Sequence, residues 1–311
     1  MPVRIQNNLP AQAILEDENI FVMTEYRAMH QDIRQLNLLV LNLMPTKEVT
    51  ETQILRKLSN TPLQVSVEFL QTATYTPTHV DHQHLDTFYK TFDEVKDRKF
   101  DGMIITGAPV ERVSFEDVNY WKELCEIMEW TKSHVHCTMH VCWGAVAGLY
   151  YHYGITKHDI KGKLSGIYEH TMCKPKSPLF RGFDDVFYMP HSRYTEVKRE
   201  EIEAVPELEV MAVSEKAGVA IVKTTDSRQF FCLAHPEYDA DTLKKEYVRD
   251  CEKGMNPDVP ENYFPDDDPT KPPLNKWRST GQLLYSNWLN YYVYQSTPYD
   301  IRNIGEENDD K

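Results

Sequence analysis

The sequence predicts an α/β protein in which a mainly parallel β-sheet is covered by helices on both faces. In the first half, short apolar runs typical of buried strands alternate with segments whose apolar residues repeat with helical periodicity. Strands and helices that alternate at this spacing imply right-handed crossovers between parallel strands. In the second half, four strand-like segments follow one another with few helices between them. They indicate an antiparallel extension of the same sheet.

Each element is predicted from its own pattern. The strands expected in the first half cover residues 36–44, 64–70, 102–106 and 135–141. The helices between them are indicated by four sets of apolar residues: Val49, Ile54, Leu55 and Leu58; Leu85, Phe88, Tyr89 and Phe92; Val118, Trp121, Leu124, Cys125 and Met128; and most of 143–153. Later strands are expected at 186–189, 210–214, 219–223 and 229–234, and helices at about 241–253 and around 284–292.

The chain of 311 residues is expected to form one domain over residues 35–299. A segment of residues 1–34 without a clear pattern precedes this domain, and an acidic tail, residues 300–311, follows it. Residues 254–275 contain six prolines and should form a long irregular loop within the domain.

Composition excludes several classes of protein. A net charge of −14 argues against a nucleic-acid partner, which would require a basic surface. No stretch approaches the ~18 consecutive apolar residues of a membrane span, and the first residues lack the apolar core of a signal peptide. The six cysteines form no C-x-x-C pair, so most should be free thiols in a reducing compartment. We therefore expect a cytoplasmic protein with no membrane partner, and a homodimer stays possible.

The clearest chemical motif is His140-Val141-Cys142-Trp143-Gly144, where a predicted strand turns into a helix. A small nucleophile at such a turn, with glycine two residues on, is typical of a nucleophile elbow. The turn would hold the sulfur at the carboxyl end of the sheet, and the helix N-terminus would favour a thiolate. The backbone N–H of Trp143 could then donate to an oxyanion. A buried cysteine is more often only a small core residue, so this motif alone does not establish a catalytic site.

A second motif changes that interpretation. The predicted strand 229–234 ends in His235-Pro236-Glu237. A histidine leaving a strand can reach the sulfur, and a carboxylate two residues on can accept a hydrogen bond from its other ring nitrogen. The two motifs together favour Cys142 as a nucleophile, His235 as its base and Glu237 as the residue that orients the base.

These motifs resemble a known family. A cysteine elbow followed about 90 residues later by a strand ending in His-Pro-Glu resembles the class I glutamine amidotransferase-like fold, a flavodoxin-like three-layer arrangement. Residues 41–47 (LNLMPTK) with Thr50-Glu51, residues 106–111 (TGAPVE) and residues 189–193 (MPHSR) look like the homoserine O-acyltransferases of methionine biosynthesis. The resemblance extends from the first residues to about Tyr299.

The resemblance implies an activity. In that family an acyl-CoA acylates the cysteine, and the hydroxyl of L-homoserine then takes the acyl group. It implies that Cys142 carries the acyl group, with His235 as general base and Glu237 as its partner. No cofactor is expected to stay bound; the acyl-CoA is a co-substrate.

The resemblance also assigns substrate-binding residues. Lys163, Ser192 and Arg249 match positions that hold substrates, although their local sequence alone would mark them as surface residues. Arg249 could bind a carboxylate through two parallel hydrogen bonds, and Ser192 could bind an amino-acid head group. Lys163 would supply a point charge. A second oxyanion donor should come from the backbone of residues 107–110, except Pro109, which has no N–H.

Glu111 bears on the acyl donor. Family members with glycine at this position look succinyl-type, and those with glutamate look acetyl-type. A succinyl chain ends in a carboxylate, and a second carboxylate within ~4 Å costs at least ~1 kcal/mol even in water. Acetyl-CoA is therefore the expected donor, and succinyl-CoA is the alternative. If Glu111 points to solvent, it selects nothing.

Other polar residues have weaker interpretations. Lys47 lies where a strand gives way to a helix, a position suited to anions, and could contact a CoA phosphate. His79, His82 and His84 beside Asp81 fit no common zinc spacing, so no metal is expected.

Two further hypotheses remain open. A glutamine amidotransferase would use the same triad and deliver ammonia to a partner synthetase. A redox sensor built on the Cys142 elbow would need neither His235 nor Glu237.

Overall fold

The computed structural model describes residues 3–5, 22–24, 35–59, 61–74, 82–298 and 300–305. Of the predicted N-terminal segment, residues 1–34, only β1 (Val3–Ile5) and β2 (Val22–Thr24) fall within these ranges, and they pair in parallel. Residues 306–311 of the acidic tail lie outside the described residues.

Within the described residues, a ten-stranded sheet has the order β5-β4-β3-β6-β7-β12-β11-β10-β8-β9. Its strands are β3 (Leu36–Leu41), β4 (Val65–Leu70), β5 (Tyr89–Lys90), β6 (Phe100–Ile105), β7 (Val135–Val141), β8 (His158–Met172), β9 (Val186–Glu196), β10 (Leu208–Ser214), β11 (Gly218–Thr224) and β12 (Gln229–Cys232). Neighbours from β5 to β12 are parallel, and those from β12 to β9 are antiparallel. The predicted parallel sheet with an antiparallel extension is confirmed.

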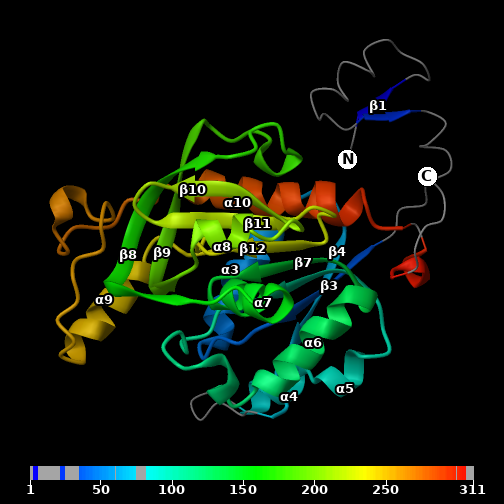
Figure 1. The fold of residues 1–311 in the computed structure, drawn as a ribbon, viewed down its shortest axis with the longest axis horizontal. Helices are drawn as coiled ribbons and strands as arrows, with labels where there is room; N and C mark the ends of the chain where they lie inside the picture. The colour runs from blue at the N-terminus through cyan, green and yellow to red at the C-terminus, as the bar shows by residue number, and fades with distance from the viewer. Residues whose placement is uncertain are drawn as a thin grey trace.

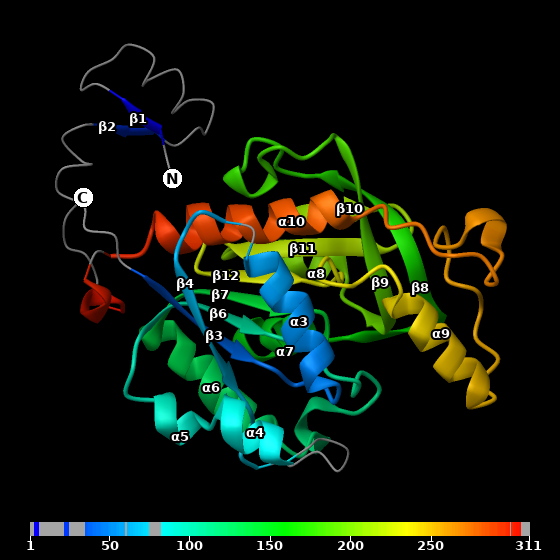
Figure 2. The same cartoon turned by 180° about the vertical axis from the view of Figure 1, so that it is seen from behind.

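Helices cover both faces of this sheet. They are α3 (Lys47–Leu58), α4 (His82–Phe88), α5 (Phe92–Val95), α6 (Trp121–His134), α7 (Trp143–Tyr153), α8 (Arg199–Glu203), α9 (Thr242–Glu252) and α10 (Arg278–Asn287), which continues as the π-helical segment η4 (Trp288–Tyr294). Short 3-10 turns are η1 (Phe115–Asp117), η2 (Pro178–Phe180), η3 (Pro265–Asp267) and η5 (Ile301–Asn303). Figure 1 shows α6 and α7 in front of the sheet, and Figure 2, seen from behind, shows α3 and α10.

The two apolar layers follow from the alternation of side chains along each strand. In β3, Leu39 and Leu41 belong to a buried cluster with residues of α6 and α7. Leu38 and Val40 belong to a second cluster with residues of α3 and α10. β3 is apolar at every position except Asn37, and it is therefore buried on both faces, as expected for a parallel sheet.

The helix predicted from Leu85, Phe88, Tyr89 and Phe92 is present but ends earlier than expected, because α4 ends at Phe88. Tyr89 leaves the helix to pair with Phe69 of β4 as the short strand β5. The backbone N–H of Thr91 then donates to the Glu94 side chain (2.7 Å), which begins the separate helix α5. The apolar spacing was helical, but a sheet hydrogen bond and a new N-terminal cap interrupt it.

The sequence did not indicate β8, a strand of fifteen residues. Its middle is rich in glycine and charged side chains, and many of these are exposed, so it lacks the alternation of a half-buried strand. β9 also extends beyond residue 189, where the predicted strand ended. Pro190 lies within it, although proline ordinarily argues against the interior of a strand. The strand β8 holds the proline-rich loop, since the backbone of Glu261 bonds to both Ser165 (2.9 Å) and Ile167 (2.8 Å).

No helix among the described residues combines the length and apolar character needed to cross a membrane.

Candidate active site

Cys142 occupies the tight turn between β7 and α7. Its backbone has φ 50° and ψ −118°, a conformation that L-residues rarely adopt. The turn is held from both sides, because the N–H of Cys142 donates to the carbonyl of Cys232 (2.7 Å) and its carbonyl accepts from Ala145 (2.9 Å). The strained turn predicted from the sequence is present, and it projects the side chain from the carboxyl end of the sheet.

Two glycines allow this turn to pack closely. A Cβ on Gly144 would lie 2.6 Å from the carbonyl oxygen of Thr106, so only glycine fits there without movement. A Cβ on Gly107 would lie 3.2 Å from the Cβ of Cys142 and 3.6 Å from the backbone nitrogen of Trp143. The loop after β6 is thus packed closely against the elbow at Gly107.

His235 and Glu237 follow β12, the strand beside β7. The N–H of His235 donates to the carbonyl of Pro190 in β9 (2.8 Å), and its Nδ1 lies 2.7 Å from Oε1 of Glu237. Both side chains are buried. The ring of Tyr238 stacks on the imidazole, with centroids 4.0 Å apart. Although β12 ends at Cys232 rather than at residue 234 as predicted, the structure brings the two motifs together.

The charges around His235 favour the charged form of its imidazole. Burial alone would lower its pKa, but the interactions with Cys142 and Glu237 raise that pKa well above the ordinary value. Such an arrangement of thiol, imidazole and carboxylate is the one that activates a cysteine nucleophile.

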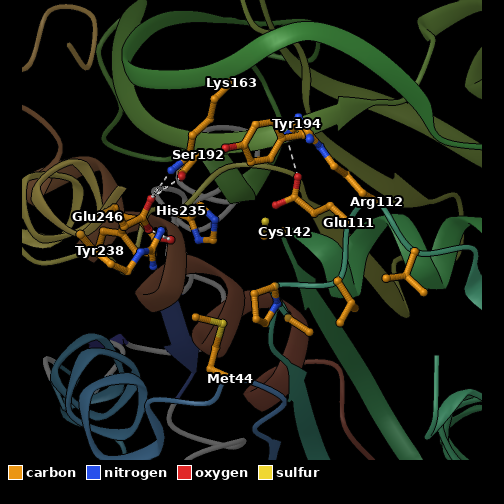
Figure 3. Close-up of a pocket in the computed structure, with 16 residues that line it drawn as sticks. Met44, Glu111, Arg112, Cys142, Lys163, Ser192, Tyr194, His235, Tyr238 and Glu246 are labelled. Carbon is orange, nitrogen blue, oxygen red and sulfur yellow. Dashed lines mark hydrogen bonds and ion pairs between the residues drawn. The ribbon is translucent and has the colours of Figure 1, made fainter. Parts of the chain in front are cut away.

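A cavity of about 250 Å³ opens over the sulfur. It is lined by Met44, Gly107, Ala108, Pro109, Val110, Glu111, Arg112, Val113, Cys142, Lys163, Ser192, Tyr194, His235, Tyr238, Glu246 and Arg249. Figure 3 shows Cys142 and His235 at the centre of this group, with Ser192 and Lys163 on one side and Glu111 on another. The residues that the sequence singled out for substrates thus share one cavity with the thiol.

One wall of the cavity is organised by Glu246, which the sequence analysis missed. Its carboxylate accepts from Ser192, from Lys163 (3.1 Å) and from the hydroxyl of Tyr238 (2.9 Å). Burial opposes ionisation of Glu246, but these donors and the charge of His235 outweigh it and lower its pKa. Glu246 and Asp250 are four residues apart on α9, a spacing that places both on one helical face and could have marked the pair.

Lys163 and Arg249 both pair with Asp250. The ammonium of Lys163 lies 3.1 Å from one carboxylate oxygen, and the guanidinium of Arg249 donates twice to the other, over 2.9 and 2.7 Å. Lys163 is mostly buried, whereas the side chain of Arg249 is 53% exposed and forms the rim of the cavity. Arg249 can therefore meet a ligand that enters from solvent.

Glu111 faces the cavity rather than solvent. Its carboxylate accepts from the backbone N–H of Tyr194 (2.6 Å), and Figure 3 shows it beside Cys142. Burial raises the pKa of this carboxyl, and the Tyr194 N–H and the charge of His235 oppose the rise. The guanidinium of Arg112 lies over the ring of Tyr194, 4.1 Å from its centroid, and packs against the same wall.

Lys47 lies apart from this cavity. Its ammonium donates to the carbonyl of Asn42, and burial lowers its pKa to about 8. Lys47 lines a second cavity of about 210 Å³, which shares Pro109, Val110 and Val113 with the first. Its contact with CoA stays a prediction.

The histidines considered for a metal are partly outside the described residues. His79, Asp81 and the side chain of His82 fall there, and His84 pairs with Glu51 (2.9 Å). In the part of the chain that the structure describes, no group of three His, Cys, Asp or Glu residues is placed to hold a metal ion.

The fold and site define an α/β protein of the class I glutamine amidotransferase-like type. A glutamine amidotransferase from Thermotoga maritima superimposes with a TM-score of 0.50 over 83% of this chain and 98% of that chain, at 13% identity, which shows the shared fold alone.

The chain belongs to the homoserine O-succinyltransferase family, whose profile matches residues 2–299. It is 58% identical to a homoserine O-acetyltransferase of Acetivibrio thermocellus over 98% of this chain and 100% of the relative. It is 60% identical to a homoserine O-acetyltransferase of Geobacillus kaustophilus, over 96% and 99%. The family resemblance inferred from the sequence is confirmed.

The ion pair predicts how Cys142 reacts with iodoacetamide. Because a neighbouring cation usually favours a thiolate at least about tenfold, His235→Ala should slow alkylation of Cys142 at least tenfold at pH 6.5. The raised pKa of His235 keeps the imidazole charged at this pH. The rates should converge near pH 9, where an ordinary thiol ionises unaided.

Timed alkylation followed by peptide mass spectrometry measures this effect. Cys251 is exposed and serves as an internal control whose rate should not change. Equal rates for Cys142 in the two proteins at pH 6.5 would contradict the ion pair.

Proposed function

We propose that this protein transfers an acetyl group from acetyl-CoA to the hydroxyl of L-homoserine, giving O-acetyl-L-homoserine and CoA, a step of methionine biosynthesis. The observation that carries the proposal is that Cys142 and His235, whose ring is bonded to Glu237, line one cavity with Lys163. The names of the two relatives described above support the same activity.

The first half-reaction acylates the enzyme. The thiolate of Cys142 attacks the thioester carbonyl of acetyl-CoA, and the negative charge that develops on the carbonyl oxygen is stabilised by the backbone N–H of Trp143 and a second N–H from residues 107–108. The bond from the carbonyl carbon to the CoA sulfur then breaks. His235 gives its proton to the departing CoA thiolate, leaving a neutral imidazole and an acetyl thioester on Cys142.

The second half-reaction transfers the acetyl group. The neutral imidazole of His235 removes the proton of the homoserine hydroxyl, and the oxygen attacks the thioester carbonyl. The bond to the sulfur of Cys142 breaks, and the ester leaves. The enzyme returns to a thiolate beside an imidazolium, and Glu237 holds the imidazole in the same orientation during both steps.

The wall of the cavity suits the amino-acid head group of homoserine. Arg249, at the rim, can bind the carboxylate through two parallel hydrogen bonds. Ser192 and Lys163 can bind the rest of the head group, and the carboxylate of Glu246 between them can accept from the ammonium group. These groups are already held in place by one another, so little ordering is needed on binding.

Glu111 favours acetyl as the transferred group. Its carboxylate shares the cavity with Cys142 and is held by Tyr194. A succinyl group on Cys142 would bring a second carboxylate into this partly buried region, where two like charges 4 Å apart repel by about 4 kcal/mol at an effective dielectric constant of about 20. An acetyl group carries no such charge.

The activity predicts products that can be measured directly. With acetyl-CoA and L-homoserine, wild-type protein should release CoA and form O-acetyl-L-homoserine, detected by mass spectrometry. Cys142→Ala should reduce the rate at least about a thousandfold, because it removes the nucleophile. Cys251→Ala is the matched control and should keep full activity, because this cysteine is exposed on α9. Release of ammonia from glutamine, without acetyl transfer, would instead support an amidotransferase.

The role of Glu111 predicts a change of donor preference. Glu111→Gly should raise the ratio of kcat/KM for succinyl-CoA to that for acetyl-CoA at least tenfold, because both charge and bulk are removed. Glu111→Gln keeps the bulk and should raise the ratio less. An unchanged ratio in both variants would show that Glu111 does not select the donor.

A further inference from the structure

Two buried oxygen atoms close to the triad lack a hydrogen-bond partner. Oε1 of Glu237 contacts His235, but Oε2 has no partner among the residues that the structure describes. The hydroxyl of Tyr285, in α10, also has no hydrogen-bond partner among the described residues. Glu237 is 6% exposed and Tyr285 is 0% exposed, so neither atom is served by bulk solvent. Leaving a buried carboxylate oxygen unbonded is costly, and more so when the group is charged.

Both side chains line the same small cavity, of about 20 Å³. This volume exceeds the roughly 10–15 Å³ that one water molecule needs. The lining is mixed: Met44, Ile54 and Val141 are apolar, whereas Thr50, Gln53 and Thr106 add polar side chains beside the two oxygens. A water needs two to four polar partners, and this lining can supply them.

We propose that this cavity binds one ordered water that accepts from the Tyr285 hydroxyl and donates to Oε2 of Glu237. A water has two donors and two acceptors, so it satisfies both orphaned oxygens at once and keeps one donor for Gln53 or Thr50. Tyr285 then becomes a positioning residue: it holds Glu237, which in turn orients His235. This role rests on the proposed function, whereas the water site itself does not.

The charges around Glu237 are consistent with this role. Burial and the negative charge of Glu237 raise the pKa of Tyr285 well above its ordinary value, so its hydroxyl stays a donor. Lys57 and Asp239 also lie within electrostatic reach: burial lowers the pKa of Lys57, and the charges of Glu237 and Asp239 oppose that decrease. The backbone near Glu237 is fixed by α10, because a Cβ on Gly281 would lie only 2.2 Å from the carbonyl oxygen of Pro236.

The test combines a crystal structure with a conservative variant. A structure of the wild-type protein, at a resolution that shows other buried waters, should contain one water within hydrogen-bond distance of both oxygens. Tyr285→Phe removes only the hydroxyl. It should slow alkylation of Cys142 at pH 6.5 about five- to tenfold. Without the hydroxyl, the charged form of Glu237 loses a hydrogen-bonded partner and stabilises the charged imidazole of His235 less. The kcat for acetyl transfer should fall by a similar factor while KM for both substrates stays unchanged.

Tyr292→Phe is the matched control. Tyr292 is a buried tyrosine two turns further along, in η4, and its hydroxyl bonds to Ser177 (3.0 Å) instead of facing the triad. This variant should alkylate at the wild-type rate. A map without the bridging water, or equal alkylation rates in Tyr285→Phe and Tyr292→Phe, would overturn the proposal. Because neither the map nor the alkylation rate depends on acetyl-CoA, a failure of the proposed activity would leave these two results interpretable.

Discussion

The structure depends on one backbone constraint, the positive φ of Cys142. A non-glycine residue in this conformation costs on the order of 1–3 kcal/mol and persists only where its surroundings fix it. Here the carbonyl of Cys232 and the N–H of Ala145 hold the turn, and Gly144 lets it pack against β6. The strand order places the other parts of the site around this turn, because β7 lies between β6 and β12. The loop after β6 and His235 after β12 therefore lie on opposite sides of Cys142.

Charge is paired throughout the site. His235 bears a positive charge between Cys142 and Glu237, and Lys163 bears one between Glu246 and Asp250. In the proposed reaction, binding of an amino acid would exchange existing partners on this wall instead of burying new uncompensated charge.

The sequence predicted what depends on local pattern. Consecutive residues define each of the features that were predicted: the buried parallel strands, the elbow at Cys142 and the His235-Pro236-Glu237 motif. It did not predict β8, whose strand structure comes from pairing with β9 and not from its own polar, glycine-rich sequence. Glu246 was missed for a similar reason, because its role appears only when α9 packs beside β8 and β9. The substrate-binding roles of Lys163 and Ser192 came from family resemblance, since isolated polar residues carry no local signal.

The central claim is that Cys142 carries the acyl group, and intact mass spectrometry tests it most directly. The protein would be incubated with acetyl-CoA in the absence of an acceptor, quenched in acid and weighed. If Cys142 carries the acyl group, the protein should gain an acetyl mass that is absent in Cys142→Ala and is lost when L-homoserine is supplied before the quench. An acetyl adduct that persists in Cys142→Ala, or product formation with no adduct at any time, would contradict it.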